Sequence, residues 1–147
     1  MFRTFLKYWL PVVLWMTIIF SASSDTHSQQ HSSRFFEPLL HWLFPSMSQT
    51  RVETIHHYFR KCCHLAEYAV LGLLVWRALH GTKSFLAPWS WPKVGGTLLV
   101  VFLYAATDEF HQVFVPGRTP MISDVFIDTA GASIGLLGLW IVHLRKR

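Results

Sequence analysis

The sequence is poor in charge and in cysteine, and it contains no internal repeat or low-complexity tract. Charged residues make up 14% of its 147 residues, against about 25% in an average soluble domain. Hydrophobic residues make up 52% and there are seven Trp, which is the composition of a membrane protein. The two cysteines, Cys62 and Cys63, are adjacent. A disulfide between them would be strained, and they lack the spacing of a metal motif.

The net charge of +5 does not indicate a nucleic-acid-binding protein. The basic residues flank apolar segments instead of lining one polar surface. Four such apolar segments predict an all-α fold, a four-helix transmembrane bundle that forms a single domain over residues 1–147. The expected spans cover about residues 5–20, 64–79, 94–111 and 125–144.

Shorter patterns predict the ends of the helices. Phe35 to Phe44 is apolar but too short to span, so we expect an amphipathic helix in the outer loop, on the membrane or on the bundle. Thr50 and Glu53 form a capping-box pattern for a helix that continues to about Leu79. Ser123 or Asp124 can cap the last helix.

The distribution of Lys and Arg predicts the orientation in the membrane. With a cytoplasmic N-terminus, eight of the 13 basic residues fall on the inner side, and four spans return the C-terminus to the cytoplasm. All eight acidic residues then fall in outer loops or at outer ends of spans. Ser21–Ser23 could end a cleaved signal peptide, but three further spans and the charge pattern favour a retained first helix.

Ionisable residues gather at the outer ends of the expected spans, where they are costly and typical of a functional site. Residues three or four apart share a helix face, and Gly131 and Gly135 form a GxxxG pattern that permits close helix packing. We therefore expect the polar faces to converge in one outward-facing pocket. Its members are Lys61, His64 and Glu67, then Asp108, Glu109, His111 and Gln112, then Arg118, and finally Asp124 and Asp128.

Carboxylates outnumber firm cations in this set, which leaves three ways to balance the charge: shared protons, protonated histidines or a bound divalent metal. His111 oriented by Asp108 is the best general-base candidate, and Glu67 with His64 is a second acid–base or ligand pair. Glu109, Gln112 and Asp128 complete the candidate catalytic residues. Lys61 and Arg118, with Asp124, are candidates for substrate binding, where the two cations would hold an anion such as phosphate.

Each residue also has a structural reading. Asp124 and Gln112 could be helix caps, Arg118 could contact a headgroup, and His64 with Glu67 could be a simple pair on a helix face. These readings do not together explain Asp108, His111 and Asp128, which lie deeper and need partners.

In these residues the chain resembles the VanZ-like family of small bacterial membrane proteins. The resemblance rests on Phe20–Ser24, Arg60–Tyr68, Asp108–Arg118, Asp124–Val125 and Asp128–Ala132. Asp128 stands where the family pattern usually has Asn. The resemblance implies an integral membrane protein with an uncleaved first span. A named member of the family is linked to resistance to teicoplanin and related lipoglycopeptides, but no settled reaction comes with the family.

The sequence thus predicts a plasma-membrane protein of the cell envelope that binds or acts on a lipid-linked cell-wall precursor, a lipoglycopeptide or a related ligand, with membrane lipid around it. It leaves open whether the protein is an enzyme. The alternative is a non-catalytic scaffold or interaction protein. A small transporter is disfavoured because no continuous polar path leads through the inner halves of the spans.

Overall fold

The computed structural model describes residues 2–24, 37–81, 85, 88–116 and 120–146, which are helical with no β-strand among them. Four long helices form the bundle: α1 (Phe2–Ser24), α3 (Gln49–His80), α4 (Trp91–Gln112) and α5 (Ile122–Leu144). A short helical segment over residues 37–43 precedes α3. The predicted all-α fold and the helix in the outer loop are confirmed, although Phe35 and Phe36 lie outside the described residues.

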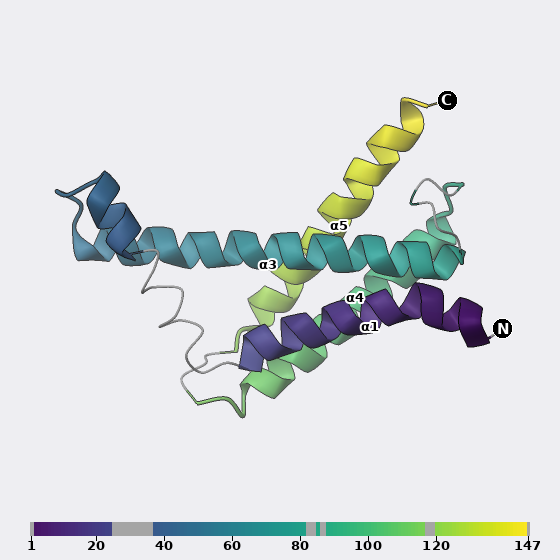
Figure 1. Cartoon of the computed structure of the whole chain (residues 1–147), viewed down its shortest axis with the longest axis horizontal. Helices are drawn as coiled ribbons and strands as arrows, with labels where there is room; N and C mark the ends of the chain where they lie inside the picture. Colours follow the sequence, from purple (N-terminus) through teal and green to yellow (C-terminus); the bar gives the residue numbers. More distant parts are fainter. Residues whose placement is uncertain (1, 25–36, 82–84, 86–87, 117–119, 147) are drawn as a thin grey trace.

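The helices form a crossed arrangement with α3 as its longest member (Figure 1). α5 crosses α3 steeply, while α1 and α4 run beside each other along α3. The ends of α1 and α4 and the start of α5 point toward the same end of the bundle. The N-terminal part of α3 extends beyond the other helices, with residues 37–43 folded against its tip. Most of the polar residues of the predicted pocket therefore come from one end of the bundle.

Three helices are long and apolar enough to cross a membrane: Phe5–Ser23 of α1, all of α3 and all of α5. Their apolar side chains are largely exposed, as expected where the surrounding solvent is lipid. α4 is of similar length but is not among the three, because Asp108, Glu109 and His111 interrupt its apolar stretch at one end. Its membrane passage, and with it the count of four spans, stays a prediction.

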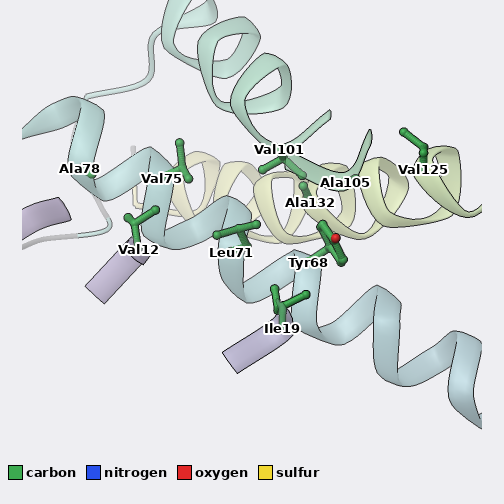
Figure 2. Close-up of a cluster of buried hydrophobic side chains, with 10 residues drawn as sticks. All are labelled: Val12, Ile19, Tyr68, Leu71, Val75, Ala78, Val101, Ala105, Val125 and Ala132. Carbon is green, nitrogen blue, oxygen red and sulfur yellow. The ribbon is translucent and has the colours of Figure 1, made fainter. Parts of the chain in front are cut away.

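The core is a cluster of buried apolar side chains to which all four long helices contribute (Figure 2). α3 and α5 share the most extensive interface. A Cβ on Gly131 would overlap the Leu65 carbonyl oxygen, and one on Gly135 would lie 2.8 Å from the Ala69 carbonyl oxygen. The close approach expected from the GxxxG pattern is confirmed, and its partner is the backbone of α3.

The predicted N-caps are wrong, whereas the end of α3 agrees with prediction. α3 begins at Gln49, so Thr50 lies inside the helix, and Glu53 accepts a hydrogen bond from Gln49. α5 begins at Ile122 after Met121, and no side chain caps either helix. Asp124 does not cap α5 because its side chain bonds to Lys61 of α3 instead of to its own backbone. α3 ends at Gly81, whose φ of 58° is the left-handed conformation that favours glycine.

Candidate functional site

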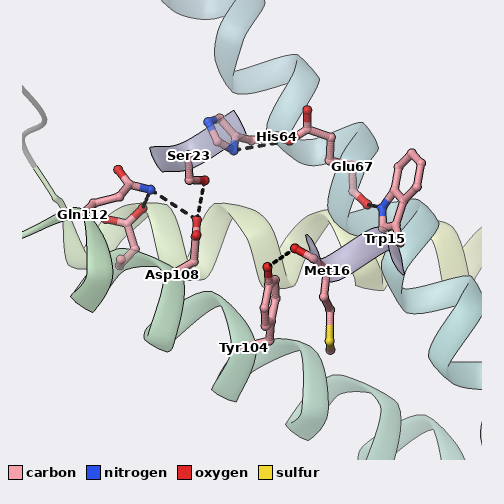
Figure 3. Close-up of polar contacts among 9 residues, drawn as sticks. Trp15, Met16, Ser23, His64, Glu67, Tyr104, Asp108 and Gln112 are labelled. Carbon is pink, nitrogen blue, oxygen red and sulfur yellow. Dashed lines mark hydrogen bonds and ion pairs between the residues drawn. The ribbon is translucent and has the colours of Figure 1, made fainter. Parts of the chain in front are cut away.

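Asp108 is the best-defined polar residue at the end of the bundle. Its side chain is buried near the last turn of α4, where Ser23 Oγ of α1 donates a hydrogen bond of 2.7 Å to Asp108 Oδ2 (Figure 3). Gln112, one turn further along α4, donates to the same oxygen at 3.2 Å. A carboxylate oxygen can accept two such bonds, so this pair ties the end of α1 to the end of α4.

Glu109 extends the network toward α5. Gln112 Nε2 also donates to Glu109 Oε1 at 3.3 Å, and the backbone N–H of Met121 donates to Glu109 Oε2 at 2.9 Å. Met121 immediately precedes α5. Gln112 therefore bridges two neighbouring carboxyl groups, and Glu109 holds the start of α5 against the end of α4.

α3 contributes two charged pairs. Lys61 Nζ contacts Asp124 Oδ1 at 2.7 Å, in a salt bridge whose two side chains are about one-third exposed or less. His64 Nδ1 lies 3.8 Å from Glu67 Oε2 (Figure 3), which is an ion pair when the histidine is protonated. His64 and Glu67, the pair expected on this helix face, thus lie beside each other, and Asp124 has an unexpected partner on another helix.

His111 packs its ring against Phe20 of α1, with ring centroids 4.3 Å apart. The hydrogen bonds described for Asp108 come from Ser23 and Gln112. Orientation of His111 by Asp108, and its use as a general base, stay predictions.

Asp128 is the second fully buried acid of the group, beside Asp108. Its side chain is 3% exposed on the face of α5 that packs inside the bundle. The charged groups that act on it electrostatically are the carboxylates of Glu109, Asp108, Asp124 and Glu67. Tyr68 of α3 is fully buried beside this group, and Asp128, Asp108 and Glu109 act on its hydroxyl. The five predicted carboxylates are therefore close enough to influence one another.

An apolar cavity of about 400 Å³ lies between the C-terminal half of α4 and the N-terminal part of α5. Glu109 is the one charged side chain among the described residues of its wall. Its other walls include Phe102, Phe110 and Phe126, all of them exposed on the surface of the molecule. The polar network and the apolar cavity thus share Glu109.

The match to known families covers nearly the whole chain. The family model described as VanZ/LLP1 matches residues 8–143. The chain belongs to the VanZ/LLP1 family. No curated protein and no solved structure matches it. The family resemblance of the sequence motifs is confirmed, and three of the motif residues of this VanZ/LLP1 chain, Ser23, Asp108 and Gln112, are in contact at the end of the bundle.

Two expectations about the VanZ/LLP1 site find no support in the described part of the chain. Arg118 lies outside the described residues, so its role as an anion contact stays a prediction. No three His, Cys, Asp or Glu side chains within the described ranges are placed to hold a metal ion. Shared protons, protonated histidines and a bound divalent metal therefore stay predictions as ways to balance the charge.

Sequence reasoning missed four contributors to the VanZ/LLP1 site. Two of them are Ser23 and the Met121 N–H, which donate to Asp108 and Glu109. The other two donate to backbone carbonyl oxygens of other helices (Figure 3): Tyr104 Oη to Met16 O at 2.6 Å, and Trp15 Nε1 to Glu67 O at 2.9 Å. Three of the four join α1 to helices distant in sequence, and the Met121 contact joins the consecutive helices α4 and α5. The one available indication was Ser23 within the motif Phe20–Ser24, which by itself resembled a cleavage site.

Proposed function

We propose that this VanZ/LLP1 protein is a multi-pass plasma-membrane protein with both termini in the cytoplasm, and that it binds or acts on a lipid-linked or cell-wall ligand at the outer end of its bundle. The observation that supports this most is the position of Glu109. That residue belongs to a hydrogen-bonded polar network and also lines an apolar cavity of about 400 Å³. A ligand with a polar head and an apolar chain matches both surfaces.

The cavity has the size and composition of a ligand site, since such sites are mostly apolar with a few placed polar groups. Its exposed phenylalanines lie on α4 and α5. In a bilayer this surface faces lipid, so a chain would enter from the side without crossing water. The polar head would then lie near Asp108 and Glu109.

The polar residues would divide the work on such a ligand. Lys61, which lies beside Asp124, and Arg118 would hold an anionic part of the head. If the protein is an enzyme, His111 with Asp108 would move a proton, and His64 with Glu67 would form the second pair. Binding of this kind would change the supply or the exposure of envelope precursors, and through it the susceptibility to teicoplanin.

Two substitutions test the catalytic form of the proposal. His111→Ala and Asp108→Asn should abolish any teicoplanin resistance that the protein gives a sensitive bacterium, while its amount in the membrane stays unchanged. Asp108→Asn preserves an oxygen that can accept from Ser23 and Gln112. His143→Ala, at the opposite end of α5, is the matched control. Full resistance in both site variants would show that catalysis is not the function.

The tight packing of α3 on α5 supports a second candidate, a non-catalytic scaffold that shields precursors or docks a partner. A scaffold would tolerate Asp108→Asn, because shape and hydrogen bonding persist. It would fail on Gly131→Leu, because the side chain would collide with the backbone of α3. The pair of variants thus separates the two candidates in one assay.

A further inference from the structure

Asp128 is a buried acid without a balancing cation in the part of the chain that the structure describes. Its side chain is 3% exposed, and the charged groups among the described residues that act on it are all carboxylates. Lys61, the cation on the facing part of α3, is already bonded to Asp124 at the rim. Burying a carboxylate in such surroundings is costly unless a proton or a cation joins it.

A buried hydroxyl beside Asp128 also lacks a hydrogen bond within the part of the chain that the structure describes. Tyr68 is completely buried, and its hydroxyl has no hydrogen-bond partner among the described residues. Buried polar groups are normally satisfied, so an unpaired hydroxyl beside a buried acid indicates that something else completes the site.

We propose that this site receives a primary ammonium group, carried by an amphiphile whose chain occupies the cavity between α4 and α5. The inference rests on the proposed function and specifies its ligand. An ammonium group has three N–H donors and one positive charge, so it supplies what Asp128 lacks.

Tyr68 suits an ammonium group in two ways. Its phenol oxygen can accept a hydrogen bond from the ammonium while its own O–H donates to a carboxylate. The rings of Tyr68 and Tyr104, with centroids 6.2 Å apart, add π faces that attract a cation.

The cavity accounts for the rest of the ligand. Glu109 carries negative charge on its wall, and the described residues around it are otherwise apolar. The same acidic residue acts on both Asp128 and Tyr68. A chain in the cavity therefore has its polar end directed toward carboxylates, which favour an amine over a neutral alcohol and disfavour a phosphate at this depth.

The test compares ligands of equal chain length on the full-length protein, purified in a mild non-ionic detergent. Native mass spectrometry measures binding of n-dodecylamine, 1-dodecanol and n-butylamine. Charged hydrogen bonds are stronger than neutral ones, so the amine should bind roughly tenfold more tightly than the alcohol. Butylamine should bind much more weakly than dodecylamine. Equal binding of the two amines would mean that the alkyl chain contributes nothing, and would contradict the proposal that the ligand is an amphiphile.

Variants locate the binding. Asp128→Asn and Tyr68→Phe should each reduce the preference for amine over alcohol, and Tyr68→Phe keeps the buried ring in case Asp128→Asn does not fold. Glu53→Gln, an exposed acid near the start of α3, is the matched control and should leave the preference unchanged. A preference that survives both site variants overturns the proposal, because water or a shared proton then completes the site.

A cavity-filling variant separates this inference from the proposed function. Ala106→Trp should block binding of both twelve-carbon ligands, whereas Ala66→Trp on an exposed face of α3 should not. Binding that needs the cavity but treats amine and alcohol alike leaves the proposed function standing and overturns the inference. Failure of both ligands to bind contradicts both.

Discussion

At the scale of single residues, the buried contact between Ser23 and Asp108 joins α1 to α4 at the end of the bundle that carries the candidate site. The two residues are 85 positions apart, and both are almost inaccessible to solvent. In surroundings without water, each lost partner of a buried carboxylate has a large cost. The contact therefore links the integrity of the site to the position of α1.

We expect Ser23→Ala to lower the free energy of unfolding by about 1–3 kcal/mol, because Asp108 Oδ2 would lose one of its two described donors. Ser21→Ala is the control, since the Ser21 hydroxyl is exposed and bonds only to the Thr17 carbonyl of its own helix. Unfolding in mixed SDS–detergent micelles measures the difference. Equal stability of the two variants would contradict a structural role for Ser23.

The sequence predicts some residues of this network and not others, for a physical reason. Asp108 and Gln112 are one turn apart on the same helix, and helical periodicity places them on one face. Ser23 joins them only through the packing of α1 on α4, which no local pattern encodes. Small hydroxyl residues after an apolar segment fit both a cleavage site and a helix contact, so the sequence alone could not choose between them.

At the scale of helices, the crossing of α3 and α5 depends on glycine. Gly131 and Gly135 let the α3 backbone reach α5, and Gly72 lies against Ala132 in the same interface. The GxxxG pattern was readable because it needs only spacing along one helix. The N-cap at Asp124 was not, since the Asp124 side chain bonds to Lys61 across the bundle, and the start of α3 lies before Thr50.

Two glycine substitutions in α5 should have opposite effects. Gly138→Ala should stabilise by up to about 1 kcal/mol, because nothing lies within 4 Å of the added Cβ and alanine favours the helix. Gly131→Ala should destabilise by about 1–3 kcal/mol, because its Cβ overlaps the Leu65 carbonyl oxygen. The same unfolding assay measures both. Similar behaviour of the two variants would mean that α3 and α5 do not cross at Gly131.

At the scale of the whole molecule, the polar residues occupy one end of an otherwise apolar bundle. The sequence predicts that all acidic residues lie on one side of the membrane, because alternate apolar segments assign each loop to a side, and this sidedness stays a prediction. The cavity was not, because it forms from the angle between α4 and α5. The sequence also does not show which charged side chains are buried close to this cavity.

The proposed orientation predicts the labelling of the native cysteines. Cys62 is exposed at the outer boundary of the expected second span, so intact cells should label it with a membrane-impermeant maleimide. A chain with Cys62→Ser, Cys63→Ser and Lys146→Cys should react only after permeabilisation, because its thiol is cytoplasmic. The reverse pattern would place the acidic end in the cytoplasm and remove wall precursors from its reach.

The length of α3 has a mechanical consequence for the surrounding bilayer. Its 32 residues make a rod of roughly 48 Å, whereas the hydrocarbon layer is about 30 Å thick. Standing upright, the rod would lift residues 37–43 and the largely exposed Trp42 roughly 18 Å clear of the hydrocarbon. Because α5 crosses α3 steeply (Figure 1), the two cannot both stand upright, and an inclined α3 lowers Trp42 toward the headgroups. The glycines at the crossing therefore influence how far residues 37–43 stand from the membrane surface.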